Sequence, residues 1–117
     1  HLEGTSPAEL RAMLAALGLG LNGLAMRYYA DPGFRAGALA HPDAAIRHKA
    51  IDLTRRGLDA LREAGGTLMT LWLGQDGFDY PFQADYARLW DAAAEALSAL
   101  AAHDPGLDLS LEYKPDE

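Results

Sequence analysis

Apolar and polar positions follow a helical period in three segments of the chain. Within each segment apolar residues recur at spacings of three and four, which is typical of a helix that buries one face. Ser6, Pro7 and Glu9 open the first segment with the residues of an N-terminal capping box, and Gly65-Gly66 closes the second. The predicted helices cover 6–17, 41–66 and 83–104.

Short and nearly continuous apolar runs separate these helices, and such runs predict strands that are covered on both faces. The predicted strands cover 17–26, 66–73 and 107–114. Because helices and strands alternate, the pattern predicts an α/β fold with a parallel sheet and right-handed crossovers. We expect one domain over 1–117, in which 1–5 is a loop or the remnant of an expression tag.

The last predicted strand differs from the others because one of its faces is polar. Leucines alternate along it and would pack against helices, whereas the other face carries acidic, hydroxyl and basic side chains. The polar face consists of Asp108, Ser110, Glu112 and Lys114. A sheet with helices on both sides would disfavour such a face, but a barrel lumen that opens onto an active site would accept it.

Candidate chemistry follows from the rule that sites in parallel α/β folds form at the carboxyl ends of strands. Glu112 could bind a hard divalent cation through oxygen, and Lys114 could hold a substrate oxygen that becomes negative during reaction. A simple ion pair on an edge strand is the alternative for these two residues. Trp72 has two readings as well: it packs in the core, or it forms a flat wall for a sugar.

Composition narrows the classes of protein that the chain could represent. The absence of cysteine excludes disulfides, thiolate metal sites and cysteine nucleophiles, and it is compatible with the cytoplasm. A net charge of −7 argues against nucleic acid as a partner. The apolar runs are all shorter than the roughly 20 residues that a membrane-spanning helix needs, so we expect no membrane partner.

At these strand ends the chain resembles the sugar isomerases of the xylose isomerase-like (β/α)8 barrel superfamily, in both the xylose isomerase and the L-rhamnose isomerase branches. "LSLEYKPDE" (109–117) is similar to the family's strand with Glu, one residue, Lys and Pro. "LWLGQDG" (71–77) is similar to its Trp-x-Gly-x-acid-Gly turn, and 76–86 resembles the rhamnose isomerase branch. Residues 28–52 resemble the family's aromatic-bearing loop and the helix after it.

The resemblance implies a part of a TIM (β/α)8 barrel with about three parallel strands, in the order α-β-α-β-α-β. It implies that Glu112 is a metal ligand and that Lys114 contacts substrate oxygens and assists a hydride shift between C1 and C2. Trp72 would wall the sugar pocket, and Tyr29 would occupy the place of the pocket aromatic. The implied partners are a monosaccharide and a divalent cation, Mg, Mn or Co.

The same resemblance implies that much of the family's site lies outside these residues. The barrel has eight βα units, and the strands with the catalytic His and the remaining metal ligands have no counterpart here. We therefore expect a fragment that is inactive alone. Three alternatives stay open: a sugar epimerase, which needs no Lys beside its metal Glu, an abasic-site endonuclease of the same superfold, and a non-enzymatic α/β module. Open sheet edges favour self-association, so we expect a homo-oligomer.

Overall fold

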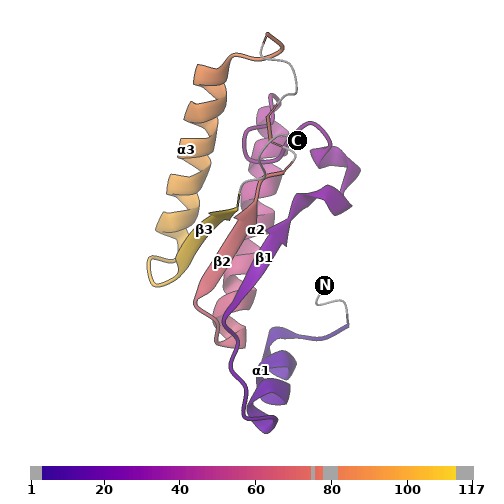
Figure 1. Cartoon of the computed structure of the whole chain (residues 1–117), viewed down its shortest axis with the longest axis vertical. Coiled ribbons are helices and arrows are strands. Elements are labelled where there is room, and N and C mark those ends of the chain that lie inside the picture. The colour runs from indigo at the N-terminus through magenta and orange to yellow at the C-terminus, as the bar shows by residue number, and fades with distance from the viewer. Residues whose placement is uncertain (1–3, 75, 78–81, 113–117) are drawn as a thin grey trace.

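A parallel sheet of three strands, in the order β1-β2-β3, forms the centre of the molecule (Figure 1). The computed structural model describes residues 4–74, 76–77 and 82–112. The strands are β1 (Gly23–Arg27), β2 (Leu68–Trp72) and β3 (Asp108–Glu112). The helices are α1 (Pro7–Ala16), α2 (Ala44–Ala64) and α3 (Tyr86–His103), with the 3-10 turns η1 (Tyr28–Ala30) and η2 (Pro32–Phe34) after β1. This order confirms the predicted α/β fold.

The first strand is shorter than predicted, because the residues that were assigned to its beginning complete α1 instead. Leu17 is the C-cap of α1. Its N–H donates to the carbonyl of Leu14, and the N–H of Gly18 donates to the carbonyl of Ala15. Gly18 has a φ of +69°, a left-handed conformation that suits glycine, and Leu19 N–H donates back to Leu14. Apolar character alone did not distinguish this helix end from a strand that would begin at Leu17.

The predicted helix ends are otherwise confirmed by their capping contacts. The Ser6 side chain accepts from Glu9 N–H while the Glu9 carboxylate accepts from Ser6 N–H, which completes the capping box. Gly65 ends α2 at a φ of +84°. In the described part of the chain, none of the helices has the length and apolar character that crossing a membrane requires.

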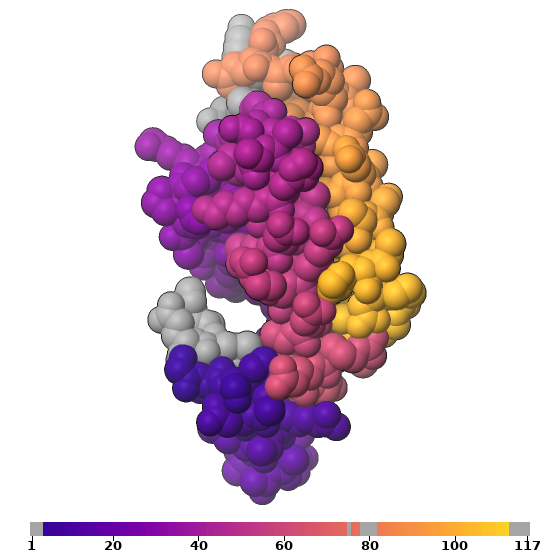
Figure 2. All heavy atoms as spheres, turned by 180° about the vertical axis from the view of Figure 1, so that it is seen from behind, coloured from indigo at the N-terminus to yellow at the C-terminus, as the bar shows by residue number. Residues whose placement is uncertain are grey.

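The two faces of the sheet have different surroundings. Met69 and Leu71 of β2 are buried on the outer face, where α2 and α3 lie side by side (Figure 2). Gly57 lets α2 approach closely, because a Cβ at this position would come within 2.8 Å of the Met26 sulfur. The side chains between these positions project to the opposite, inner face. That face is turned toward the viewer in Figure 1.

The leucines of β3 pack less completely than their pattern predicts. Leu109 is partly buried against the core, but Leu111 is 50% exposed. Because β3 is the last strand of the described sheet, Leu111 has β2 on one flank only. The expectation that this whole face packs against helices is therefore wrong at Leu111.

Candidate functional site

Arg27, Trp72 and Glu112 form one row across the carboxyl ends of the three strands. In the parallel register Arg27 pairs with Trp72, and Trp72 pairs with Glu112. Residues that pair in register point to the same face, and this face is the inner one. Arg27 and Glu112 are exposed and Trp72 is half-buried between them. These three residues, called the inner row from here on, place a cation, a flat aromatic surface and a carboxylate side by side.

The indole of Trp72 is held from two directions. The Tyr29 ring, from the turn after β1, meets it edge to face with centroids 5.6 Å apart and planes at 89°. Gly74 lies so close that a Cβ there would come within 2.2 Å of the indole. The tyrosine ring and the glycine backbone thus fix the orientation of the indole before any ligand arrives.

Arg27 is linked to this aromatic pair. Its Nη1 donates to the Tyr29 hydroxyl at 3.4 Å, and this hydrogen bond raises the pKa of Arg27 above its already high value. The negative charge of Glu112 contributes in the same direction but less. Arg27 is thus a permanent cation that lies in the field of Glu112.

The loop between β1 and α2 is long, but its contacts hold it firmly. The buried Tyr28 hydroxyl donates to the Thr54 hydroxyl of α2 at 2.7 Å. The Thr54 hydroxyl in turn donates a hydrogen bond to the Ala50 carbonyl at 2.8 Å. Burial raises the pKa of Tyr28 to about 12, so this phenol stays neutral. Asp31 pairs with Lys49 of α2 at 2.6 Å. These contacts fix the backbone on both sides of Tyr29.

Asp76 ties the same loop to the turn after β2. Its Oδ1 accepts from the N–H groups of Ala38, at 2.9 Å, and Ala40, at 2.7 Å. Its Oδ2 is buried without a hydrogen-bond partner among the described residues. Burial raises the pKa of Asp76, although the two N–H groups favour the charged form and oppose this shift. Asp76 also lines a shallow hollow next to Tyr29 and Trp72.

A larger hollow of about 370 Å³ lies elsewhere, between the N-terminal ends of α2 and α3. Its walls mix Arg47 and Arg88 with Asp85, Asp91 and Glu95, so no single ligand charge is favoured. It contains none of the side chains in the inner row. The inner row is the better candidate site because its side chains converge at the carboxyl ends of parallel strands.

The structure brings together three of the four residues that the sequence predicts for the site. Trp72, Tyr29 and Glu112 lie at one edge of the sheet, whereas Lys114 is outside the described residues. Sequence reasoning placed Arg27 and Asp76 after the first two predicted strands but assigned neither a role in the site. Asp76 is also the acidic residue of the turn over 71–77 that resembles the family's. Its contacts with the loop before α2 could not be predicted, because the partners are 36 and 38 positions away.

The described residues do not form a metal site by themselves. No group of three or more His, Cys, Asp or Glu side chains in 4–74, 76–77 and 82–112 is arranged to hold an ion. Glu112 could supply one oxygen ligand, but a hard divalent cation takes at least six. A metal bound at this edge would therefore need ligands from outside the described residues.

Three parallel strands with helices on the outer face and a row of polar and aromatic side chains at the carboxyl ends define a segment of a (β/α)8 barrel. The family described as the xylose isomerase-like TIM barrel matches residues 1–117, and the chain belongs to this family. A xylose isomerase domain protein from Planctomyces limnophilus has a similar fold, with a TM-score of 0.62 and 18% identity. The similarity covers the whole of this chain and 44% of that one.

Xylose isomerases are also similar in sequence. The chain is 28% identical to the xylose isomerase of Thermus thermophilus over 97% of its own length and 32% of the relative's. It is 33% identical to the xylose isomerase of Paraburkholderia phytofirmans over 76% of its own length and 21% of the relative's. The chain thus spans about a third or less of these curated relatives. The resemblance to the family and the partial-barrel fold are confirmed.

Proposed function

We propose that this chain supplies one wall of the active site of a divalent-metal-dependent sugar isomerase that converts an aldose into a ketose. The observation that carries the proposal is the pairing of Trp72 with Glu112 at the carboxyl ends of β2 and β3. A carboxylate beside an indole face suits a sugar, because the indole covers its C–H surface while the carboxylate binds polar groups. The similarity to xylose isomerases supports the same choice.

Each site residue has a proposed role. Trp72 and Tyr29 form the wall against which the sugar lies, and Glu112 contributes one ligand to a divalent cation. Such a cation, Mg, Mn or Co, would polarise substrate oxygens. Lys114 would contact the substrate oxygens and assist the hydride shift between C1 and C2. The remaining ligands would come from a complete barrel, so the chain alone is proposed to be inactive, and its cytoplasmic location stays a prediction.

The test compares variants of the full-length protein that contains this chain. The purified protein is stripped with a chelator, supplied with Mg²⁺, Mn²⁺ or Co²⁺, and incubated with single aldoses while NMR follows the ketose. We expect Glu112→Gln and Lys114→Ala to lower kcat/KM by roughly 100-fold or more. Glu63→Gln is the matched control, because this exposed glutamate lies on α2, away from the inner row, and should leave turnover unchanged.

Other products or unaffected variants would decide against the proposal. An epimerised aldose without ketose would identify an epimerase of the same fold. Equal turnover by the wild type, Glu112→Gln and Lys114→Ala would exclude the assigned roles. The 117-residue chain, assayed in parallel, should show no turnover because the described residues offer one carboxylate ligand at the row.

A further inference from the structure

Arg27 occupies a position in the inner row that the proposed isomerase function leaves without a role. Arg27 lies on β1 and Glu112 on β3, and Trp72 on β2 lies between them. Neighbouring strands lie about 4.8 Å apart, so the backbones at the two ends of the row are roughly 10 Å apart. A sugar chain that lies on the indole and reaches Glu112 at one end would extend toward Arg27 at the other.

The guanidinium of Arg27 has donors to offer such a chain. It carries five N–H groups, and among the described residues only the Tyr29 hydroxyl accepts from it, at the long distance of 3.4 Å. Arg27 stands at the carboxyl end of a strand, and it donates its hydrogen bond to the tyrosine whose ring orients Trp72.

We propose that Arg27 binds the hydroxyl oxygens at the end of the sugar that is remote from Glu112. This inference rests on the proposed function and adds to it how the substrate's length and orientation are recognised. Trp72 supports the middle of the sugar, and Glu112 lies at the end of the sugar where the carbonyl chemistry takes place. Arg27 thereby selects sugars that are long enough to span the row.

The charge of the row favours a neutral polyhydroxy chain over a phosphorylated sugar. A phosphate site gathers several donors, such as arginine together with lysine or a helix N-terminus. Arg27 is the sole cation of the described row and faces the carboxylate of Glu112 across it. One guanidinium suits hydroxyl oxygens, to which it donates without having to neutralise a second charge.

The experiment measures how affinity depends on substrate length. The full-length protein is titrated by calorimetry with glycerol, erythritol, xylitol and sorbitol, which are unreactive linear polyols of increasing length. Wild type should gain affinity at the length that reaches Arg27. In Arg27→Met this gain should disappear, with a loss of about tenfold for the longest polyols and none for glycerol. Arg27→Lys should keep part of the gain, because an ammonium still donates.

A matched control separates the contact from a general loss of charge. Arg56→Met removes an exposed arginine from α2 and should not change any of the four affinities. An equal loss for all polyols, glycerol included, would show that Arg27 only maintains the shape of the site and would overturn the inference. Unchanged affinities in Arg27→Met would also overturn it. So would a phosphorylated hexitol that binds far more tightly than sorbitol in an Arg27-dependent way.

Aldose turnover in the same preparations distinguishes this inference from the function on which it rests. If wild type isomerises an aldose while Arg27→Met binds every polyol as wild type does, only the role of Arg27 is wrong. If wild type neither isomerises an aldose nor binds a polyol, the proposed function fails and the inference fails with it.

Discussion

Asp76 joins the two loops that follow β1 and β2. Its Oδ1 accepts two backbone N–H groups from the loop that carries Tyr29, while the aspartate itself follows the strand that carries Trp72. A shift between these loops would change the contact of the two aromatic rings. Asp76 is thus a positioning residue that acts through Tyr29 and Trp72.

Two substitutions of Asp76 distinguish the loss of the Oδ1 hydrogen-bond acceptor from the loss of the negative charge. In Asp76→Ala the N–H groups of Ala38 and Ala40 lose their partner, and we expect the free energy of unfolding to fall by about 1–3 kcal/mol. In Asp76→Asn the amide oxygen still accepts from both, so stability at neutral pH should stay close to wild type. Urea unfolding of both variants measures the difference. Equal losses in the two variants would contradict the role of Oδ1.

Side chains on strands were easier to predict from sequence than side chains that act through loops. Trp72 and Glu112 were identified because strand alternation and the rule about carboxyl ends apply to any parallel sheet. The resemblance to the family added Tyr29. The row that unites Arg27 with them depends on the register between strands, and the contacts of Asp76 depend on how two loops fold together. Neither property is encoded in a local pattern.

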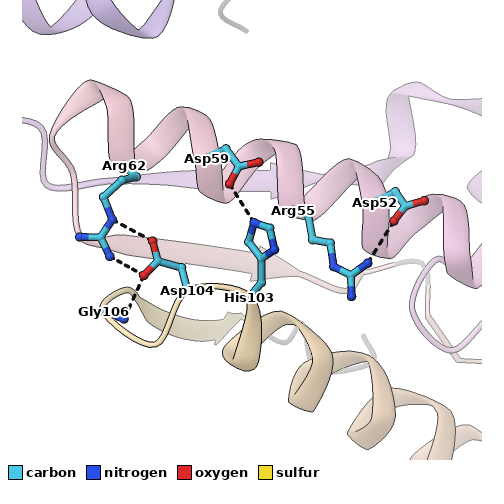
Figure 3. A network of polar contacts seen from close by, with 7 residues as sticks. All are labelled: Asp52, Arg55, Asp59, Arg62, His103, Asp104 and Gly106. Carbon is cyan, nitrogen blue, oxygen red and sulfur yellow. Dashed lines mark hydrogen bonds and ion pairs between the residues drawn. The ribbon is translucent and has the colours of Figure 1, made fainter.

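At the scale of elements, polar contacts join α2 to the end of α3 (Figure 3). Arg62 of α2 holds the Asp104 carboxylate with two parallel hydrogen bonds, Nε to Oδ2 at 2.8 Å and Nη2 to Oδ1 at 2.5 Å. Asp104 Oδ1 also accepts from Gly106 N–H, in the turn that leads to β3. Nearby, His103 contacts Asp59 at 2.8 Å. These contacts fix the direction in which the chain enters β3 and so the position of Glu112.

Acid should weaken the contact between Arg62 and Asp104. The hydrogen bonds from Arg62 hold the pKa of Asp104 below its ordinary value of 3.8. The folded state therefore binds fewer protons at this group than the unfolded state, and the stabilisation is present above pH 3.8. It is lost as the pH falls through the lower folded pKa. Unfolding of wild type and Asp104→Asn at several pH values should show a gap in stability at pH 7 that closes on acidification.

Asp52→Asn is the control for this prediction. Asp52 pairs with Arg55 within α2 at 3.3 Å, so its loss leaves the contact between the helices intact. Its effect on stability should be small, since exposed ion pairs within one helix contribute little. A gap between wild type and Asp104→Asn that is the same at pH 3 and pH 7 would mean that Arg62 does not stabilise the ionised form of Asp104.

Whole elements followed their sequence signals where the signals were local. The capping box at Ser6 and the left-handed Gly65 placed helix ends within a few residues, because both act through contacts with their immediate neighbours. The predicted start of β1 was wrong, because apolar residues such as Leu17 and Leu19 fit the end of a helix as well as the start of a strand. Their assignment to the end of α1 depends on Gly18, whose left-handed backbone the apolar pattern does not reveal.

At the scale of the whole molecule, several large apolar side chains stay exposed at separate places. Leu17 is 71% exposed near the end of α1, Trp90 is 74% exposed on α3, and Leu111 is 50% exposed on the edge strand. Edge strands also present unpaired backbone groups that can bind another strand. Exposed apolar side chains and open edges both favour association between copies of the chain. The net charge of −7 opposes association, because it makes the copies repel one another.

We therefore expect the 117-residue chain, studied alone, to form dimers or higher oligomers, and more so as salt is added. Salt shortens the range of the repulsion to about 10 Å at 0.1 M, whereas the attraction between apolar surfaces persists. Light scattering over a range of protein and salt concentrations measures both effects. Trp90→Ser should shift the balance toward monomer if the α3 surface takes part, and Ala45→Ser is its control, because it changes an exposed position on α2 and leaves the net charge unchanged. A strictly monomeric chain at high concentration and high salt, with a cooperative melt, would show that these apolar side chains and open edges do not drive association.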